Sequence, residues 1–231
     1  MDFMFNIFKL IKRDKYKKES YAQCGEDIII DYIFSMLKIV NPTYLDLGAH
    51  HPRYLSNTYY FYKKGINGIL VEPDPELCID IRNDRPNDIC LNVGVGIINS
   101  QAKFYIMTTR TLNTFSKKDA ERYSSYGNQK IERITKIQLL PLNTIIEKYC
   151  VKTPNLVSLD IEGLDFEVIT SLNLEKYRPE VICIETLTYS ENKTETKTNN
   201  IIDYMLSSGY FIYADTYINT IFVDIQVWKK R

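Results

Sequence analysis

The sequence predicts an α/β fold in which helices cover both faces of a doubly wound, mostly parallel sheet. Short apolar runs that end at a turn residue or a carboxylate alternate along the chain with segments of helical periodicity. Two β-rich runs joined by a short polar segment follow, and predict a C-terminal antiparallel hairpin. With 231 residues, 45% of them hydrophobic and 25% charged, the chain has the size and balance of one compact domain.

The first half of the chain contains four predicted strands and three predicted helices. The apolar residues of the first helix share one stripe, and Glu26 and Asp27 lie in its first turn, where the helix dipole favours acidic groups. Asp74 and Pro75 are suited to cap and to begin the third helix. We expect strands at 43–47, 68–72, 89–93 and 102–107, and helices at 28–37, at 56–64 and from residue 75.

In the second half of the chain, predicted strands and helices alternate again after a polar segment. Residues 109–136 are rich in Ser, Lys, Arg and Tyr without clear strand alternation, so we expect an insertion of loop and helix there. Gly209 is a typical residue to follow a helix end. We expect strands at 156–160 and 181–185, helices at 164–172 and 201–208, a polar loop at 191–200, and a hairpin of 210–214 with 220–227.

Residues 1–19 form a leader before the single domain predicted for 20–231. Apolar residues dominate positions 1–11, and a basic cluster follows at 12–18. A secretion signal has the opposite order and a cleavage site of small residues, so export is not expected. A short helix packed on the domain is favoured over peripheral contact of residues 1–18 with an anionic membrane face. The expected location is therefore the cytoplasm.

Charge and cysteine usage exclude several classes of function. Lys plus Arg equal Asp plus Glu at 29 each, so the chain offers no general attraction for nucleic acid. The five cysteines include no C-x-x-C pair, and the two histidines, His50 and His51, are adjacent. Neither a disulfide framework nor a zinc or histidine-rich metal site is indicated. The composition fits a reducing compartment and leaves the oligomeric state open.

The ends of the first two predicted strands indicate a nucleoside site. In a doubly wound sheet, ligands bind beyond the carboxyl ends of the strands where the strand order reverses. The first strand is followed by Gly48, and Glu72 at the end of the second can accept hydrogen bonds from two ribose hydroxyls. The loop lacks the three glycines of a dinucleotide fingerprint. S-adenosylmethionine has no phosphate and carries positive charge, which Asp46 suits.

Several short segments together resemble the FkbM-type S-adenosylmethionine-dependent methyltransferases, over about residues 20–225. They are Asp46-Leu-Gly-Ala-His50, Ser56-Asn-Thr58, Val71-Glu-Pro-Asp-Pro75, Asn92-Val-Gly94 and Asp160-Ile-Glu-Gly163, preceded by a lead-in at 20–27. The resemblance implies a Rossmann-like methyltransferase sheet and O-methylation, most often of a sugar hydroxyl in a glycan or natural product. The sequence departs from the family at 50–52, where Asn and Gly are more usual. Acceptor specificity is expected from 109–136.

The candidate site residues follow from these motifs. The expected cofactor contacts are Asp46, Gly48, Ala49, Glu72, Asn92, Gln23 and Glu26. A sugar hydroxyl is a poor nucleophile, so a group must take its proton, and the candidates are Asp160, Glu162 and His50, with His51 and Glu185 as further strand-end possibilities. Asp160 and Glu162 are ranked as bases above a divalent cation site, and they are alternatively helix-capping acids.

Two other functions compete with a sugar or small-molecule O-methyltransferase. A nicotinamide-dependent sugar oxidoreductase would use the same fold, but the loop after the first strand is poor in glycine. A non-catalytic partner subunit could keep the methyltransferase fold without turnover. An active enzyme is favoured over the second alternative by the presence of Asp46, Glu72, Asp160 and Glu162.

Overall fold

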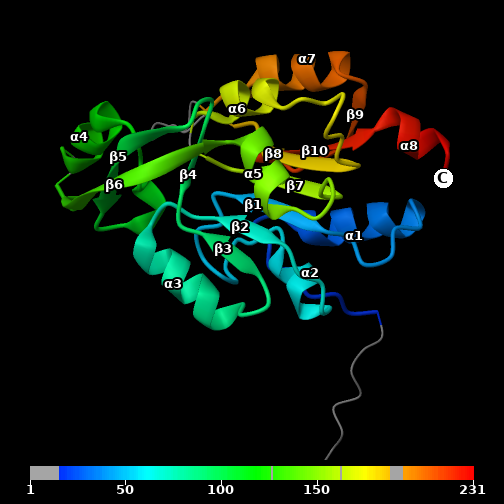
Figure 1. The fold of residues 1–231 in the computed structure, drawn as a ribbon, viewed down its shortest axis with the longest axis horizontal. Coiled ribbons are helices and arrows are strands. Elements are labelled where there is room, and N and C mark those ends of the chain that lie inside the picture. The colour runs from blue at the N-terminus through cyan, green and yellow to red at the C-terminus, as the bar shows by residue number, and fades with distance from the viewer. Residues whose placement is uncertain (1–15, 126, 162, 188–194) are drawn as a thin grey trace, which may run out of the picture.

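The computed structural model describes residues 16–125, 127–161, 163–187 and 195–231 (Figure 1). Their main sheet has seven strands in the order β3-β2-β1-β7-β8-β10-β9, and five of them run parallel. β10 is antiparallel to both β8 and β9. The strands are β1 (Tyr44–Leu47), β2 (Ile69–Val71), β3 (Ile89–Leu91), β7 (Leu156–Leu159), β8 (Val181–Glu185), β9 (Tyr210–Asp215) and β10 (Asn219–Asp224). The predicted doubly wound, mostly parallel sheet with a C-terminal hairpin is confirmed.

Helices cover both faces of this sheet, as Figure 1 shows above and below the strands. Leu45 and Leu47 pack on the face of α5 (Leu142–Tyr149), α6 (Asp165–Ser171) and α7 (Asn199–Ser207). Tyr44 packs on the opposite face with α1 (Glu26–Met36), α2 (Tyr59–Lys63) and α3 (Pro75–Asp84). Because side chains alternate along a strand, Asp46 also points toward the α1–α3 face. The sheet is therefore buried on both sides, which explains why its strands read as continuous apolar runs.

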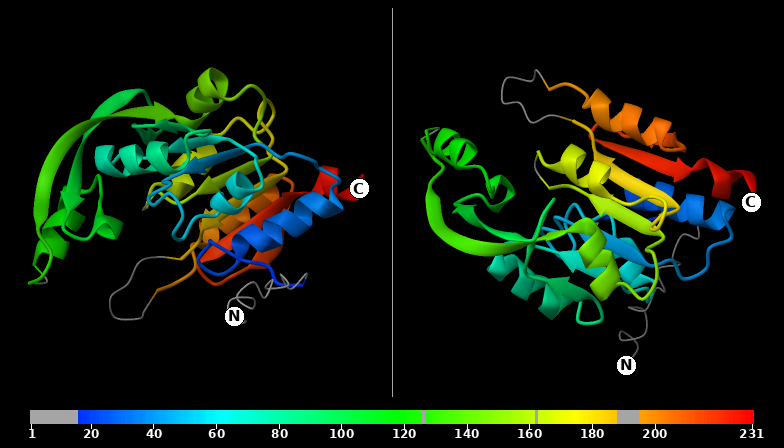
Figure 2. Two further views of the ribbon diagram at one scale, coloured as in Figure 1. Left: turned by 90° about the horizontal axis from the view of Figure 1, so that it is seen from below. Right: turned by 45° about the horizontal axis from the view of Figure 1, so that its top comes forward.

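A second sheet of three strands, in the order β4-β6-β5, lies beside the first. Its elements are β4 (Gly94–Gly96), β5 (Ser100–Met107), a 3-10 turn η1 (Arg110–Leu112), α4 (Lys117–Ser124) and β6 (Ile131–Pro141). Figure 2 shows the long β5–β6 hairpin arching away from the main sheet with α4 near its end. We call residues 100–141 the arm. They connect the β3–β4 region to α5.

The arm corrects the expectation of loop and helix over 109–136. Helical turns do occur there, but residues 131–136 belong to β6, which pairs with β5 along most of its length. Most side chains of this part of β6 are exposed or half-buried on both faces, so they lack the apolar alternation of a strand with one buried face. β4 and α5 were also not predicted.

The C-terminal hairpin is shorter than predicted. β10 ends at Asp224, whose Oδ1 accepts hydrogen bonds from the backbone N–H groups of Gln226 and Val227 at 2.6 and 3.2 Å. This carboxylate caps α8 (Ile225–Lys229), because a side-chain acceptor satisfies N–H groups that a helix start leaves free. The apolar residues at 225–227 therefore continue in a helix rather than in the strand.

The strand order places a switch point at the centre of the main sheet. From β1 the chain moves outward through β2 and β3, and after the arm it returns to β7 on the other side of β1. The carboxyl ends of β1 and β7 therefore face a crevice between loops that leave in opposite directions, where doubly wound folds bind ligands.

A fully buried arginine connects three segments of the fold through hydrogen bonds. Arg85, at the end of α3, is 0% exposed and its Nε donates to Oδ2 of Asp88 at 2.7 Å. Its Nη2 donates to the Tyr44 hydroxyl at 3.1 Å and to Thr58 Oγ1 at 3.0 Å. Thr58 Oγ1 in turn donates to Oδ2 of Asp46 at 2.5 Å. One guanidinium thus connects α3, the segment before α2 and β1.

We predict that Arg85→Ala lowers the free energy of unfolding by about 3–5 kcal/mol, because it leaves Asp88 buried without its cationic partner. Urea denaturation measures this change. The matched control is Arg53→Ala, which removes the exposed pair with Asp84 and should change stability little. Equal effects of the two substitutions would contradict the structural role of Arg85.

Candidate active site

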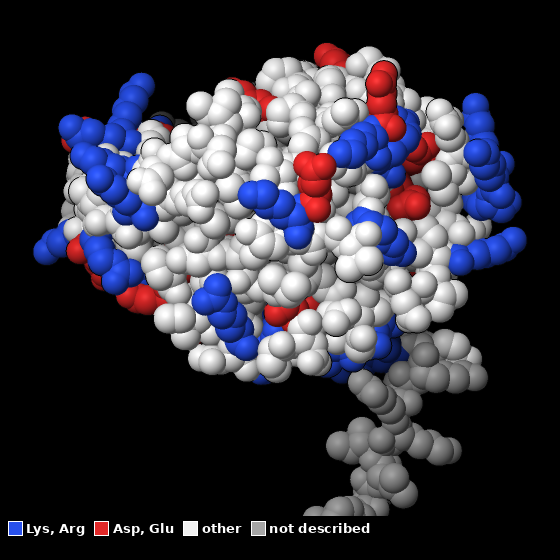
Figure 3. Space-filling view, in the orientation of Figure 1, with Lys and Arg blue, Asp and Glu red and all other residues white. Residues whose placement is uncertain are grey.

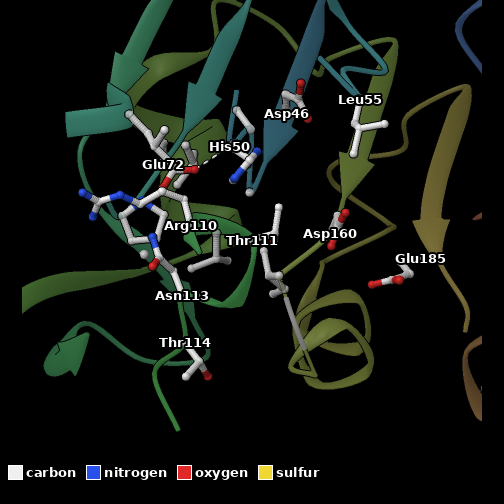
Figure 4. Close-up of a pocket in the computed structure, with 18 of the residues that line it drawn as sticks. Asp46, His50, Leu55, Glu72, Arg110, Thr111, Asn113, Thr114, Asp160 and Glu185 are labelled. Atoms are coloured by element: carbon white, nitrogen blue, oxygen red, sulfur yellow. Dashed lines mark hydrogen bonds between the residues drawn. The ribbon is translucent and has the colours of Figure 1, made fainter. Parts of the chain in front are cut away.

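A cavity of about 630 Å³ opens at the carboxyl ends of the central strands (Figure 4). Its walls come from the ends of β1, β2, β7 and β8, from the segment between β1 and α2, and from the arm. This volume lies within the range of small-molecule sites. Of the residues predicted for the site, the described lining includes Gln23, Asp46, Gly48, Ala49, His50, Glu72 and Asp160.

Gly48 allows the ends of β1 and β7 to approach closely. Its φ is +82°, and a Cβ atom there would lie 1.8 Å from the carbonyl oxygen of Asp160. The N–H groups of Gly48 and Ala49 both donate to the carbonyl of Val71, at 3.0 and 3.1 Å. The turn after β1 is therefore fixed against β2 and β7, and position 48 excludes every side chain.

Glu72 is a buried carboxyl group with two backbone donors. Its Oε2 accepts from the N–H of His50 at 2.8 Å, and its Oε1 accepts from the N–H of Asp74 at 2.7 Å. Burial outweighs these hydrogen bonds and raises the pKa of Glu72 to about 8. Each carboxyl oxygen has a further lone pair, and the residue lines the cavity. Glu72 can therefore accept hydrogen bonds from a pair of ligand hydroxyls.

Asn92 supports Glu72 from outside the cavity lining. Its Nδ2 donates to the carbonyl oxygens of Glu72 and Pro73 at 2.9 and 3.0 Å. Both donors of its amide are thus directed to the backbone that follows β2. Asn92 is not among the residues that line the cavity, so a direct contact with a cofactor stays a prediction.

His50 lies beside Glu72, as Figure 4 shows. Its φ is +49°, an uncommon value for a residue other than glycine, and its backbone N–H is the Glu72 donor. Burial lowers the pKa of the imidazole, so the ring is neutral at neutral pH. Its Nε2 is buried and has no hydrogen-bond partner among the described residues. A ligand in the cavity could satisfy this nitrogen.

Three carboxyl groups lie at the other end of the cavity. Asp46 is 5% exposed, and burial raises its pKa despite the hydrogen bond from Thr58. Asp160 is exposed to the cavity, yet the surrounding protein raises its pKa to about 7, with a smaller contribution from the charge of Asp165. Glu185, at the end of β8, also lines the cavity, and the strand register places it level with Asp160, because Leu159 is paired with Ile184. Glu162, the other predicted base, lies outside the described residues.

Gln23 and Glu26, the two lead-in residues predicted at the site, occupy different positions: only Gln23 is among the lining residues of the cavity. Glu26 is fully buried and is not among the lining residues; its Oε1 accepts from Thr216 Oγ1 at 2.6 Å and from Asn219 Nδ2 at 3.0 Å. Glu26 therefore joins the start of α1 to the β9–β10 turn and reaches the cavity indirectly, through Asn219.

The arm supplies wall residues that the sequence reasoning missed. Phe104 and Phe115 pack with ring centroids 4.7 Å apart, and both line the cavity, as does Leu77 of α3. A Cβ atom on Gly94 would come within 2.6 Å of Phe115, so the glycine of Asn92-Val-Gly94 makes room for this ring. No local motif marks the aromatic residues, because their place depends on how the second sheet packs.

Polar contacts fix the arm to α3. Arg110 forms ion pairs with Asp74 and Glu76 at 3.3 and 2.9 Å, and Asn113 Nδ2 donates to Oδ2 of Asp74 at 2.9 Å. Asp74 also caps α3 by accepting from the N–H of Glu76, as predicted. The residue that caps α3 thereby also holds the arm beside the cavity.

A family model of the methyltransferase FkbM domain matches residues 46–212. The chain belongs to this family. The matched range contains Asp46, Gly48, Glu72 and Asp160, and it extends through the arm to β9. No curated protein sequence matches the chain.

Solved structures of several methyltransferases are similar to this one at low sequence identity. Precorrin-6y C5,15-methyltransferase from Geobacter metallireducens has 11% identity and a TM-score of 0.44, with 91% of this chain and 94% of that chain covered. An O-methyltransferase from Bacillus cereus in complex with SAH has 9% identity and a TM-score of 0.45, with 90% and 84% covered. A TehB-like SAM-dependent methyltransferase from Corynebacterium glutamicum has 9% identity and a TM-score of 0.44, with 87% of each covered.

The described residues include neither a membrane-spanning helix nor a cluster of metal ligands. Every helix within 16–125, 127–161, 163–187 and 195–231 is too short or too polar to cross a bilayer. In the same residues, no group of three or more His, Cys, Asp or Glu side chains is arranged to hold a metal ion.

We predict that Gly48→Ala is far more destabilising than Gly65→Ala, as measured by urea denaturation. Both glycines have positive φ, which costs an alanine about 1–2 kcal/mol. A Cβ at position 65 has no atom within 4 Å, whereas at position 48 it collides with the Asp160 carbonyl. If Gly48→Ala does not fold, the same contrast appears as loss of soluble protein. Similar stabilities of the two variants would refute the close approach of β1 and β7.

Glu72 should make the stability of the protein depend on pH. The folded protein keeps the Glu72 proton up to a pKa of about 8, whereas the carboxyl group ordinarily loses it near 4.5. In that window the folded state binds more protons, so the free energy of unfolding falls as pH rises. We expect this fall to be less steep in Glu72→Gln, measured by denaturation between these two pH values. The exposed Glu175→Gln is the control and should retain the wild-type slope.

Proposed function

We propose that the protein is an S-adenosylmethionine-dependent O-methyltransferase that acts on a hydroxyl group of a sugar or glycan-type acceptor. The observation that carries the proposal is the buried Glu72 carboxyl group beside the Gly48 turn, within a cavity at the switch point of an FkbM-family fold. This is the position from which a carboxyl group can bind a ribose.

The cavity residues fit the cofactor from one end to the other. Leu77, Phe104 and Phe115 form an apolar end suited to an adenine ring. Glu72 follows at the place for the ribose hydroxyls. Asp46 and Asp160 lie toward the other end and suit a cationic group, because opposite charges attract strongly in a partly desolvated site.

S-adenosylmethionine, when bound, supplies an electrophilic methyl group. The protein must hold the acceptor hydroxyl in line with that methyl group and remove its proton, and alignment alone can supply much of the rate. Asp160 faces the cavity and has a pKa raised to about 7, close to the working pH of a general base. It is the proton acceptor that the described structure favours. His50, whose neutral ring lies beside Glu72, is placed nearer the ribose position.

The acceptor side of the cavity is rich in groups that bind hydroxyls. Gln23, Asn57 and Asn219 present amides there, and Glu185 presents a carboxyl group. Tyr54 is 64% exposed while it lines the cavity, so its ring can pack against the apolar face of a sugar. These features support a polyhydroxylated acceptor over a purely apolar one.

The charge distribution supports a small-molecule or glycan acceptor rather than nucleic acid. Figure 3 shows Lys and Arg side chains over the region of the arm, with acidic side chains among them. Within α4, Lys117 pairs with Glu121 and Arg122 pairs with Asp119, at 3.3 and 3.1 Å. Partners, a cytoplasmic location and membrane contact through residues 1–18 stay predictions.

We predict that the purified protein binds S-adenosylmethionine saturably and does not bind NADH, as measured by isothermal titration calorimetry. Glu72→Ala should weaken the binding at least tenfold, because the ribose loses its acceptor. Glu175→Ala is the control and should bind as the wild type does. Preference for NADH would favour an oxidoreductase over a methyltransferase.

Transfer to a hydroxyl is tested by incubating the protein and methyl-labelled S-adenosylmethionine with fractionated glycans and sugar nucleotides. We expect the label in an ether that resists mild base, at a carbon-bound oxygen assigned by NMR. Label found only in amine or carboxyl fractions would contradict O-methylation of a sugar hydroxyl. Cofactor binding without transfer to any fraction would support a non-catalytic subunit.

A further inference from the structure

Two cysteine side chains are in contact between α3 and β3, which lie side by side in Figure 1. Cys78 of α3 is fully buried, and Cys90 of β3 is 5% exposed. Their Sγ atoms are 2.9 Å apart, and both cysteines are free. The sulfur–sulfur bond of a disulfide is about 2.05 Å long, so the two sulfurs lie within about 1 Å of bonding distance.

Hydrogen bonds hold α3 against β3 at this point. Arg82, one turn after Cys78, donates from Nε and Nη2 to the carbonyl oxygen of Cys90, at 3.3 and 2.8 Å. The backbone N–H of Cys78 donates to the carbonyl of Asp74, the residue that caps α3. Cys90 is paired with Leu70 in the parallel ladder of β2 and β3. Closing the two sulfurs to bonding distance therefore needs only a small movement of either element.

Cys78 is the more acidic thiol of the pair. The hydrogen bond with Cys90 lowers the pKa of Cys78, and the nearby Arg82 cation also lowers it, against the effect of burial. The same hydrogen bond and burial raise the pKa of Cys90. Burial also raises the pKa of the other cysteines in the described residues, which are Cys24, Cys150 and Cys183. Because the thiolate is the reactive form, oxidation of the pair begins at Cys78.

We propose that Cys78 and Cys90 are a site of oxidative modification, where a peroxide forms a reversible disulfide that stabilises the fold beside the cavity. The inference does not depend on the proposed function, because it involves neither a cofactor nor an acceptor. The bond joins two elements that border the cavity. α3 contributes Leu77 to the lining, and β3 is followed by Asn92, which donates to the carbonyl of Glu72.

The oxidation balances with one molecule of hydrogen peroxide. The Cys78 thiolate attacks a peroxide oxygen, the O–O bond breaks, and the sulfur becomes a sulfenic acid while the other oxygen leaves as water with the thiol proton. The Cys90 sulfur then attacks the sulfenic sulfur, the S–S bond forms, and the hydroxyl group leaves with the Cys90 proton as a second water. The two thiols are oxidised by two electrons in total, and the peroxide is reduced by two. A dithiol reductant reverses the reaction by thiol–disulfide exchange.

The buried position of the pair determines how it reacts and what the bond does. A small peroxide reaches the sulfurs when α3 opens locally, whereas a bulky reagent does not. The disulfide closes the loop between residues 78 and 90, which restricts the unfolded chain more than the folded one. Since the sulfurs already face each other, the folded protein gains little strain. We expect the bond to raise Tm by about 5 °C or more.

Peptide mapping and calorimetry test the proposal on the full-length protein. The reduced protein is treated with hydrogen peroxide under native conditions, the remaining thiols are alkylated, and the protein is digested without reductant. We expect a linked peptide pair that joins Cys78 to Cys90 and that disappears on treatment with dithiothreitol. Cys24→Ser, which removes an exposed thiol, is the control and should form the same link and show the same rise in Tm. Cys78→Ser and Cys90→Ser should show neither.

Three results would overturn the proposal. If Cys78 and Cys90 are still alkylated after denaturation when the exposed Cys24 has been oxidised, the pair is not a site of modification. If Cys78 becomes a sulfinic acid while Cys90 stays a thiol, the two sulfurs do not form a bond. If the link forms and Tm does not rise, the stabilising role is refuted. The wild-type map decides the first two points even where a serine variant does not fold.

Discussion

The buried charge of Arg85 is the constraint on which the crevice depends. A guanidinium at 0% exposure must keep its partners, because an unpaired ion in the interior is far more costly than a paired one. Its partners, Asp88, Tyr44 and Thr58, come from a loop, from β1 and from the turn before α2. The demand of one side chain for hydrogen bonds thus joins the start of β1 and the loop before β3 to the segment before α2, and residues 54–57 of that segment line the cavity. Thr58, the last residue of Ser56-Asn-Thr58, bridges from Arg85 to Asp46.

The cavity combines two electrostatic environments. Around Glu72, backbone N–H groups of the turns after β1 and β2 converge on a single buried carboxyl group. Around Asp160, burial and the charges of Asp165 in α6 and Asp46 in β1 raise the pKa of the carboxyl group. A ligand with hydroxyl donors in its middle and positive charge at one end satisfies both environments. This complementarity favours a cationic nucleoside over a dinucleotide, whose phosphates would face the carboxyl groups.

The arm gives the family fold its particular cavity. A doubly wound sheet alone would leave the apolar end open, and the arm closes it with Phe104 and Phe115. The same segment is held to the N-terminus of α3 through Arg110 and Asn113. Its effects therefore reach the cofactor half of the cavity, in addition to the acceptor specificity proposed for it.

The sequence by itself determined the sheet, its carboxyl edge and most residues on that edge. Apolar periodicity and turn residues are local properties, so they identified the parallel strands, the α3 cap at Asp74, and the positions of Gly48, Glu72 and Asp160. The tertiary structure decided what depends on contacts between distant segments. Contacts across the fold join Glu26 to the β9–β10 turn and Asn92 to the backbone that follows β2. They also make part of a polar segment into β6 and place Glu185 level with Asp160. Strand pairing and side-chain partners follow from packing across the fold, which periodicity along the chain does not encode.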